Sequence, residues 1–361
     1  MFLLHRTLLA VSLLLVASCA PRPEFVLAPE AASTGTNRMV HVATSRAAEA
    51  DGRFLNRRNE GLSFLGVEVS VPPQHRAGQI EYPNAQPDPY KHFLTTRKTR
   101  LDGAPGFRQS LKRSLSRLPR NERETVVFVH GFNNTMTEGT YRTVQLVHDF
   151  KLEGVAVHYS WPSAGNPLGY GYDRDSMLFA RDGLEQTLRE VAKSGSQRTI
   201  LVAHSMGALL TMEVLRQAPD LAKTLGGVIL MSPDIDVEVF RSQAARIGDL
   251  PQPFVIFASK KDRALRLSAR LTGQKERLGN LGKTDELADL NVTLVDVTEF
   301  STGGFNHFLT GDSPALIRLL SSVRDLETAF RQDRAGRAGL LPGTVLTVQN
   351  ATQVILQPLN R

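Results

Sequence analysis

The chain has one cysteine and one tryptophan among its 361 residues. A single thiol cannot form an internal disulfide, and without paired cysteines the common cysteine-rich zinc sites are excluded. The zinc-protease pattern His-Glu-x-x-His is also missing. The stretch "GYGYDR" at 169–174 lacks the third glycine of a dinucleotide-binding loop. We therefore expect no metal and no other cofactor.

Acidic residues are fewer than basic ones, which leaves a net charge of +7. A positive field attracts anionic lipid or nucleic acid. However, the basic stretches "RKTR" at 97–100 and "LKRSLSRLPR" at 111–120 lack interleaved aromatic residues. They fit a connecting region and an amphipathic helix with a solvated face. We therefore expect no nucleic-acid partner.

The apolar stretch at the N-terminus, about ten residues after His5 and Arg6, is too short to span a membrane and is typical of a secretory signal peptide. The "VASC" at its end resembles the lipobox of bacterial lipoproteins, whose cysteine is acylated and becomes the new N-terminus. We expect removal of residues 1–18 and a lipid anchor on Cys19. Ala20 resembles the outer-membrane sorting pattern, which predicts a location in the cell envelope facing the periplasm. The alternative is an ordinary signal peptide with an incidental cysteine.

The rest of the chain divides by composition into three parts. Residues 19–37 are rich in Pro, Ala, Ser and Thr, which predicts a flexible tether after the lipidated N-terminus. Residues 38–333 alternate apolar runs with helical patterns, as expected of an α/β domain with a mainly parallel, doubly wound sheet. The tail, 334–361, contains an alternating stretch at 344–357 that predicts a polar hairpin outside the main domain.

Eight apolar runs predict the strands of this sheet, and helical spacing of apolar residues predicts helices near 174–193, from Met206 to Arg216, and after Ser313. Between residues 73 and 124 lies a proline-containing connection with no clear strand, which predicts an excursion or a functional loop. The predicted strands are 39–45, 64–72, 125–131, 154–162, 199–204, 226–233, 253–260 and 292–300.

A serine between small residues occurs twice, in "AASTG" at 31–35 and in "AHSMG" at 203–207. The pattern is weak alone, so its structural context has to decide between the copies. The first copy lies in the predicted tether, whereas the second follows the strand "TILVAH" and opens a helix. We therefore predict that Ser205 is a nucleophile, exposed at a sharp strand-to-helix turn that requires small neighbours.

A serine nucleophile needs a base, and after such a turn the partners follow in the order acid, histidine. His307 is the only one of the nine histidines that lies C-terminal to Ser205. Two loops offer the acid: Asp262 follows the penultimate predicted strand, and Asp234 and Asp236 follow the strand before it. We favour Asp262, because the other two also suit turn and helix-cap positions.

Acyl transfer also requires two backbone N–H groups that bind the developing oxyanion. Met206, directly after the nucleophile, supplies the first. We expect the second from Phe132 in "VHGFNN", where His130 shapes the loop rather than exchanging protons. Trp161 in "SWPSAG" either lines the substrate entrance or packs at a strand end.

Together the motifs resemble a family of bacterial α/β hydrolases of largely uncharacterised function. The resemblance covers residues 38–325. It implies the α/β-hydrolase fold with Ser205, an aspartate and His307 in matching positions, and it implies no particular substrate. The motifs are "VATSR", "VSVPPQHRAGQIEYP", "HGFNN", "WPSAG", "YDRDS", "AHSMGA", "SPDID", "ASKKDRALRLS" and "RLG".

These features predict a lipoprotein serine hydrolase that cleaves a carboxylic ester, or a thioester or amide, through an acyl-Ser205 intermediate. Its substrate is then a small-molecule or lipid-like acyl compound, and its membrane contact is the N-terminal anchor. The competing interpretation is a non-catalytic envelope lipoprotein that uses the hydrolase scaffold to bind a partner, since fold does not guarantee chemistry.

Overall fold

The computed structural model describes residues 22–273, 276–282, 284–301, 307–321, 343–348 and 351–356. Cys19 and the predicted signal peptide lie outside the described residues. In the part of the chain that the structure describes, no helix combines the length and apolar character needed to cross a bilayer.

The centre of the molecule is an 11-stranded sheet. Its strands are β1 (Thr36–Ala48), β2 (Phe54–Val71), β3 (Leu94–Leu101), β4 (Glu124–Val129), β5 (Val155–Ser160), β6 (Arg198–His204), β7 (Gly227–Met231), β8 (Phe254–Ala258), β9 (Thr293–Asp296), β10 (Gly343–Val348) and β11 (Ala351–Leu356). They lie in the order β10-β11-β9-β8-β7-β6-β4-β5-β1-β2-β3. All pairs from β11 to β1 are parallel, and both ends of the sheet are antiparallel.

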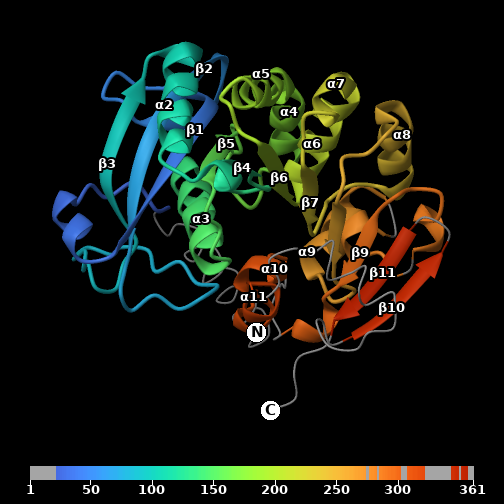
Figure 1. Ribbon diagram of the computed structural model, residues 1–361. Coiled ribbons are helices and arrows are strands. Elements are labelled where there is room, and N and C mark those ends of the chain that lie inside the picture. The colour runs from blue at the N-terminus through green and yellow to red at the C-terminus, as the bar shows by residue number, and fades with distance from the viewer. Residues whose placement is uncertain are drawn as a thin grey trace, which may run out of the picture.

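Helices cover both faces of the sheet (Figure 1). They are α2 (Gly103–Ser116), α3 (Met136–Asp149), α4 (Tyr170–Phe179), α5 (Arg181–Ala192), α6 (Met206–Gln217), α7 (Pro219–Ala222), α8 (Val237–Ile247), α9 (Arg263–Leu271), α10 (Leu309–Asp312) and α11 (Pro314–Ser321). Helices α2, α5, α6 and α8 pack on one face, and α3 and α11 on the other. The α/β-hydrolase fold with a mainly parallel, doubly wound sheet is thus confirmed.

The core has two layers because the central strands are buried on both sides. Leu201 and Ala203 of β6 face the layer under α6, whereas Val202 faces the layer under α11. Strands buried on both faces read as continuous apolar runs rather than alternating ones. This is why all eight predicted strands are present in the structure.

The expectation of a connection without a strand between 73 and 124 is wrong, because β3 lies there and contains "RKTR" at 97–100. The amphipathic helix predicted at 111–120 is present as α2, although α2 begins earlier, at Gly103, and ends at Ser116. Strand β3 forms the edge of the sheet and exposes Arg97, Lys98 and Arg100, so its sequence lacks an apolar run. The helix predicted near 174–193 is also two helices, α4 and α5, which meet at Ala180.

The predicted flexible tether is wrong for residues 22–37. Ala28 N–H donates to the Thr95 carbonyl at 2.9 Å, and Thr95 N–H donates to the Val26 carbonyl at 3.0 Å. Ala28 and Ala31 are buried against Leu94 of β3. Backbone pairing with an edge strand therefore orders this segment despite its composition. Its "AASTG" copy starts in a short 3-10 helix, Pro29–Ser33, and is followed by strand β1 rather than by an α-helix.

The predicted C-terminal hairpin is present as β10 and β11, but its placement outside the main domain is wrong. Strand β11 pairs in parallel with β9, with Thr352 opposite Thr293. Val354 and Leu356 are buried in the main core. The hairpin therefore extends the central sheet; its turn, residues 349–350, lies outside the described residues.

Candidate active site

Ser205 lies at the sharp turn between β6 and α6, with φ 54° and ψ −121°. A non-glycine residue in such a conformation costs on the order of 1–3 kcal/mol, so its surroundings have to hold it. Its N–H donates to the Met231 carbonyl at 3.0 Å, and its carbonyl accepts from the Asp234 N–H at 3.2 Å. Met231 is the last residue of β7 and Asp234 comes three residues later, so the neighbouring strand fixes the turn at Ser205.

Two glycines allow the loop after β4 to approach this turn. A Cβ at Gly207 would collide with the carbonyl oxygen of His130. A Cβ at Gly131 would lie 2.8 Å from the Cβ of Ser205. The small residues around Ser205 therefore serve close approach of backbone, as the sequence predicts.

His307 lies between Ser205 and Asp262. Its Nε2 is 2.7 Å from Ser205 Oγ, and its Nδ1 is 2.9 Å from Asp262 Oδ2. An ionised carboxylate only accepts hydrogen bonds, so Nδ1 carries the ring proton and Nε2 accepts from the serine hydroxyl. The Ser205 side chain can therefore pass its proton directly to His307.

Asp262 is fully buried, and both carboxylate oxygens have partners. While Oδ2 faces His307, Oδ1 accepts from the Leu265 N–H at 3.0 Å and so caps α9. By contrast, 23% of the His307 side chain is exposed. A substrate can thus reach the imidazole while the acid stays dry.

The two alternative aspartates do not contact His307. Asp234 accepts from the Tyr170 hydroxyl at 2.9 Å and from the Ser268 hydroxyl at 2.6 Å. Arg277 Nε lies 3.2 Å from the same carboxylate, an ion-pair distance without hydrogen-bond alignment. Asp236 caps α8 by accepting from the Val239 N–H at 3.1 Å. The structure therefore brings Asp262, and neither alternative, to His307.

The peptide between Gly131 and Phe132 has a defined orientation. His130 Nδ1 lies 2.9 Å from the Gly131 carbonyl, and the Asn134 amide donates to that carbonyl at 3.4 Å. In a trans peptide the C=O and N–H point in opposite directions, so the Phe132 N–H points away from both groups. Among the described residues, neither this N–H nor that of Met206 has a hydrogen-bond acceptor.

His130 and Trp161 are packing residues. Their rings stack at 4.9 Å and 11°, and the indole N–H donates to the His130 carbonyl at 2.7 Å. Both are buried, so Trp161 packs at the strand end and does not line an entrance. Burial, together with nearby Arg46, lowers the pKa of His130 to about 3, so the ring is neutral.

Sequence reasoning missed Arg46, which is fully buried beneath the loop after β4. Its guanidinium donates to the Asn134 carbonyl at 2.7 Å and the Ser163 carbonyl at 3.0 Å. It also donates to Ser160 and Asn56 side chains at 2.9 Å and 2.6 Å. Burial lowers its pKa to about 10, which still leaves it cationic at neutral pH. In the sequence Arg46 is the last residue of the motif "VATSR", but the motif alone does not indicate a role for it.

Asp173 was missed in the same way, within the motif "YDRDS". It accepts from the Asn133 N–H at 3.0 Å, the Ala164 N–H at 2.6 Å and the Ser163 hydroxyl at 2.5 Å. Burial raises its pKa, and the hydrogen bonds and Arg46 oppose that shift. Because Asn133 has φ 57°, the bond to Asp173 helps to hold a strained turn directly after Phe132.

His204, directly before Ser205, contacts His307 through a hydrogen bond and through its ring. Its Nε2–H donates to the His307 carbonyl at 3.0 Å, and the two rings lie 4.7 Å apart. Burial lowers the pKa of His204 well below its usual value, so it is a neutral positioning group. It therefore holds His307 through the backbone.

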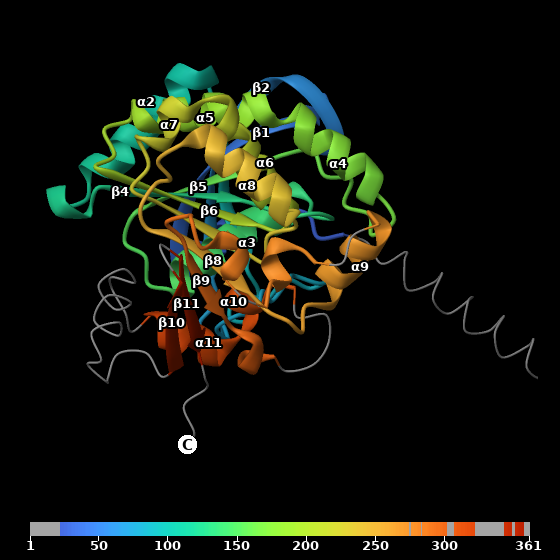
Figure 2. The same cartoon turned by 90° about the vertical axis from the view of Figure 1, so that its right-hand side faces the viewer.

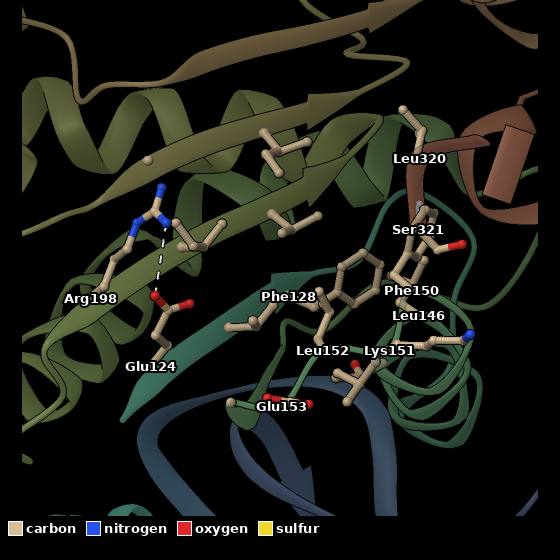
Figure 3. Close-up of a pocket in the computed structure, with 18 of the residues that line it drawn as sticks. Glu124, Phe128, Leu146, Phe150, Lys151, Leu152, Glu153, Arg198, Leu320 and Ser321 are labelled. Atoms are coloured by element: carbon tan, nitrogen blue, oxygen red, sulfur yellow. Dashed lines mark ion pairs between the residues drawn. The ribbon is translucent and has the colours of Figure 1, made fainter. Parts of the chain in front are cut away.

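A cavity of about 520 Å³ lies elsewhere, on the face of the sheet under α3 and α11. Figure 3 shows Arg198 and Glu124 paired at one end and Leu320 and Ser321 at the other, with apolar side chains such as Phe128 between them. Ser205, Asp262 and His307 do not line it. Among the described residues, no group of three or more His, Cys, Asp or Glu side chains could hold a metal ion.

A family model described as an alpha/beta hydrolase of unknown function (DUF900) matches residues 107–324. The chain belongs to this family. A search of curated proteins finds no match.

Similar solved structures include the following three proteins. Est1E from Butyrivibrio proteoclasticus is 12% identical, over 72% of this chain and 94% of that one, with a TM-score of 0.36. Thermogutta terrifontis esterase 2, phosphonylated by sarin, is 12% identical over 76% and 92%, with a TM-score of 0.34. Paleococcus ferrophilus monoacylglycerol lipase is 15% identical over 55% and 94%, with a TM-score of 0.34. The fold assignment rests on the family match and the strand order.

Proposed function

We propose that this member of the DUF900 family is a serine hydrolase that cleaves a carboxylic ester, or a thioester or amide, through an acyl-Ser205 intermediate. The observation that carries the proposal is the continuous hydrogen-bonded path from Ser205 Oγ through His307 to Asp262. In this assignment Ser205 is the nucleophile, His307 the general base and Asp262 the acid that orients the imidazole.

The reaction starts when Ser205 Oγ attacks the substrate carbonyl carbon and His307 Nε2 takes the hydroxyl proton. Asp262 stabilises the resulting imidazolium. The tetrahedral intermediate then expels the leaving alcohol, thiol or amine, which receives the proton from His307. In the second half a water molecule, deprotonated by His307, attacks the acyl carbon, releases the acid and restores Ser205.

The Phe132 and Met206 N–H groups form the oxyanion hole in this proposal. Support comes from the orientation of the Gly131–Phe132 peptide, which leaves the Phe132 N–H directed away from His130 and Asn134. Met206 is the first residue of α6, where unpaired N–H groups favour negative charge. Arg46 and Asp173 act as positioning residues, because their bonds to Asn134 and Asn133 fix the loop.

The test is covalent labelling with a fluorophosphonate probe, followed by peptide mass spectrometry. We expect the label on Ser205 and its loss in Ser205→Ala. Ser232→Ala is a matched control, because Ser232 also follows a strand and also has a left-handed φ, 46°. A well-folded protein that neither takes the label at Ser205 nor hydrolyses small aryl esters would instead be the non-catalytic envelope lipoprotein.

We further propose that Cys19 carries lipid and holds the protein in the bacterial cell envelope, on the periplasmic side of the outer membrane. The position of Cys19 after "VAS" and the lack of a partner cysteine support this. Mass spectrometry should find an acylated N-terminal peptide that begins at Cys19. Wild type should stay in the membrane fraction after a high-salt wash, and Cys19→Ala should be released. Equal retention of both proteins would place the anchor elsewhere.

A further inference from the structure

Helix α9 has an unusual solvent-facing side. It packs inward through Leu265, Ser268 and Ala269. The side chains that face outward are Arg263, Arg266, Leu267, Arg270 and Leu271. Positions three and four residues apart share one side of a helix, so these residues form one continuous strip. Two of these outward-facing residues are large and apolar: Leu267 is 53% exposed and Leu271 is 63% exposed.

The strip carries positive charge without acidic neighbours on the helix. Residues 260–271 read "KKDRALRLSARL", and their only acid, Asp262, is buried. In the described part of the chain, Arg266 bonds only backbone carbonyls, those of Lys261 and Asp262. Arginines interleaved with exposed leucines are typical of helices that lie in the headgroup region of an anionic membrane.

A third exposed leucine lies near α9. Leu168, in the loop before α4, is 88% exposed. The next turn of chain is tied to α9, because the Tyr170 and Ser268 hydroxyls are 2.8 Å apart. Figure 2 shows α4 and α9 next to each other on one side of the molecule. We call Leu168, Arg266, Leu267, Arg270 and Leu271 the α9 surface.

The α9 surface lies beside the candidate active site. Asp262, the N-cap of α9, bonds His307 through its carboxylate. Tyr170, whose hydroxyl lies 2.8 Å from that of Ser268 on α9, contacts Phe132, with the two ring centroids 5.5 Å apart. The α9 surface is therefore connected to His307 through Asp262, and to the loop of Phe132 through Tyr170.

The first described residue, Arg22, contacts the loop that carries Phe132. Arg22 donates to the Asn133 carbonyl at 2.6 Å and pairs with Glu138 at 2.7 Å. Two residues, Ala20 and Pro21, separate Arg22 from Cys19, so the two ends are at most roughly 11 Å apart in a fully extended chain. A lipid on Cys19 would therefore enter the membrane close to the loop that carries Phe132.

We propose that the α9 surface docks onto an anionic lipid bilayer. Its leucines enter the boundary between headgroups and acyl chains, and its arginines contact lipid phosphates. Because Asp262, which caps α9, bonds His307, docking through α9 brings His307 close to the lipid surface. Combined with the proposed hydrolase function, on which this last step rests, this proximity favours acyl groups presented by membrane lipids as substrates.

The first test measures insertion with a dye at a single thiol. In a Cys19→Ala chain, Leu267→Cys is labelled with an environment-sensitive fluorophore and mixed with vesicles of phosphatidylcholine and phosphatidylglycerol. We expect a blue shift and a several-fold rise in emission, and much smaller changes with phosphatidylcholine alone. No change at position 267 would overturn the proposal.

The control for insertion is Tyr90→Cys, labelled in the same background. Tyr90 is exposed, and its carbonyl accepts from Gln74 next to His75, which bonds Asp149 at the far end of α3. It therefore lies at the opposite edge of the sheet from the site. The dye at Tyr90 should stay in water. Equal changes at both positions would mean unspecific adsorption and would also overturn the proposal.

The second test measures the charge contribution by vesicle co-sedimentation of the Cys19→Ala chain. Each arginine near an anionic surface contributes about 1 kcal/mol, so Arg266→Ala with Arg270→Ala should weaken binding about 30-fold. Lys112→Ala with Arg113→Ala removes the same charge from exposed positions on α2 and should weaken binding much less. Equal losses in the two pairs would contradict a specific surface.

Fluorophosphonate labelling of each variant separates this proposal from the catalytic one. Labelled Ser205 without docking would refute the surface and leave the hydrolase. Docking without labelled Ser205 would leave the surface and refute the hydrolase.

Discussion

The loops after β7 and β8 place similar carboxylates at the same edge of the sheet, with different surroundings. Asp234 and Asp262 are both buried a few residues after a parallel strand. Asp262 uses one oxygen to cap α9 and turns the other to His307. Asp234 faces Tyr170, Ser268 and Arg277, away from His307. Both strands place a buried aspartate at this edge of the sheet. The difference between the two lies in their partners: His307 reaches Asp262, and Tyr170 and Ser268 reach Asp234.

The two aspartates are also connected. Ser268, which donates to Asp234, is on the helix that Asp262 caps. The Asp234 cluster therefore anchors the body of α9, while Asp262 holds its first turn beside His307. In the proposed mechanism Asp262 orients His307, whereas Asp234 stabilises the scaffold. Replacing each by a neutral isostere separates these contributions.

The largest effect should come from removing the groups that Asp262 serves. Ser205→Ala and His307→Ala should each lower kcat on a small aryl ester by roughly 10⁴- to 10⁶-fold, and the double variant should be little worse, because a catalytic unit acts as a whole. Steady-state kinetics with an active-site titration measures this. Additive losses would show that the two residues do not share one step.

Asp262→Asn should lower kcat by about 10⁴-fold, because the amide favours the wrong tautomer of His307, as the comparable change does in serine proteases. Asparagine is also a good helix cap, so α9 should stay folded and Tm should change little. Kinetics and thermal melts of the same samples check both parts. Activity near wild type would remove Asp262 from the proposed triad.

Asp234→Asn should do the opposite. It leaves the buried Arg277 without its counter-charge, which should lower the free energy of unfolding by about 3–5 kcal/mol. The kcat of the folded protein should stay within about tenfold, because no group in contact with His307 changes. Urea unfolding measures the change in the free energy of unfolding, and steady-state kinetics measures kcat. Collapse of kcat in a stable variant would move the acid to β7 and leave Ser205 and His307 in place.

Tyr170→Phe should have the smallest effect, because it keeps the ring and removes only the hydroxyl, with its hydrogen bonds to Asp234 and Ser268. We expect a loss of about 1.5–3 kcal/mol in unfolding free energy and nearly unchanged kcat. Burial and Asp234 raise the pKa of Tyr170, so its contribution is present below pH about 10 and is lost as pH rises through the folded pKa. The wild-type advantage over the variant should therefore shrink in alkali. A constant difference would contradict this role.

Sequence reasoning located the elements whose residues carry a local signal. Ser205 was found from its strand and helix, and His307 from its position after Ser205. Arg46 and Asp173 were missed because a buried ion has no periodicity, and its partners come together only in the fold. Strand β3 could not be predicted because its exposed residues are polar and interrupt the apolar run. The outward side of α9 can be identified only in the structure, which shows which of its residues are buried.

The packing of Trp161 has a practical consequence. It is the only indole in the chain, and it stacks on His130 directly before the loop that carries Phe132. Intrinsic tryptophan emission therefore comes from one place in the protein. Loosening of this loop would admit water to the indole and shift its emission to longer wavelength, while rearrangements far from it would leave the spectrum unchanged. The native protein thus carries an optical reporter of its own site, without any label.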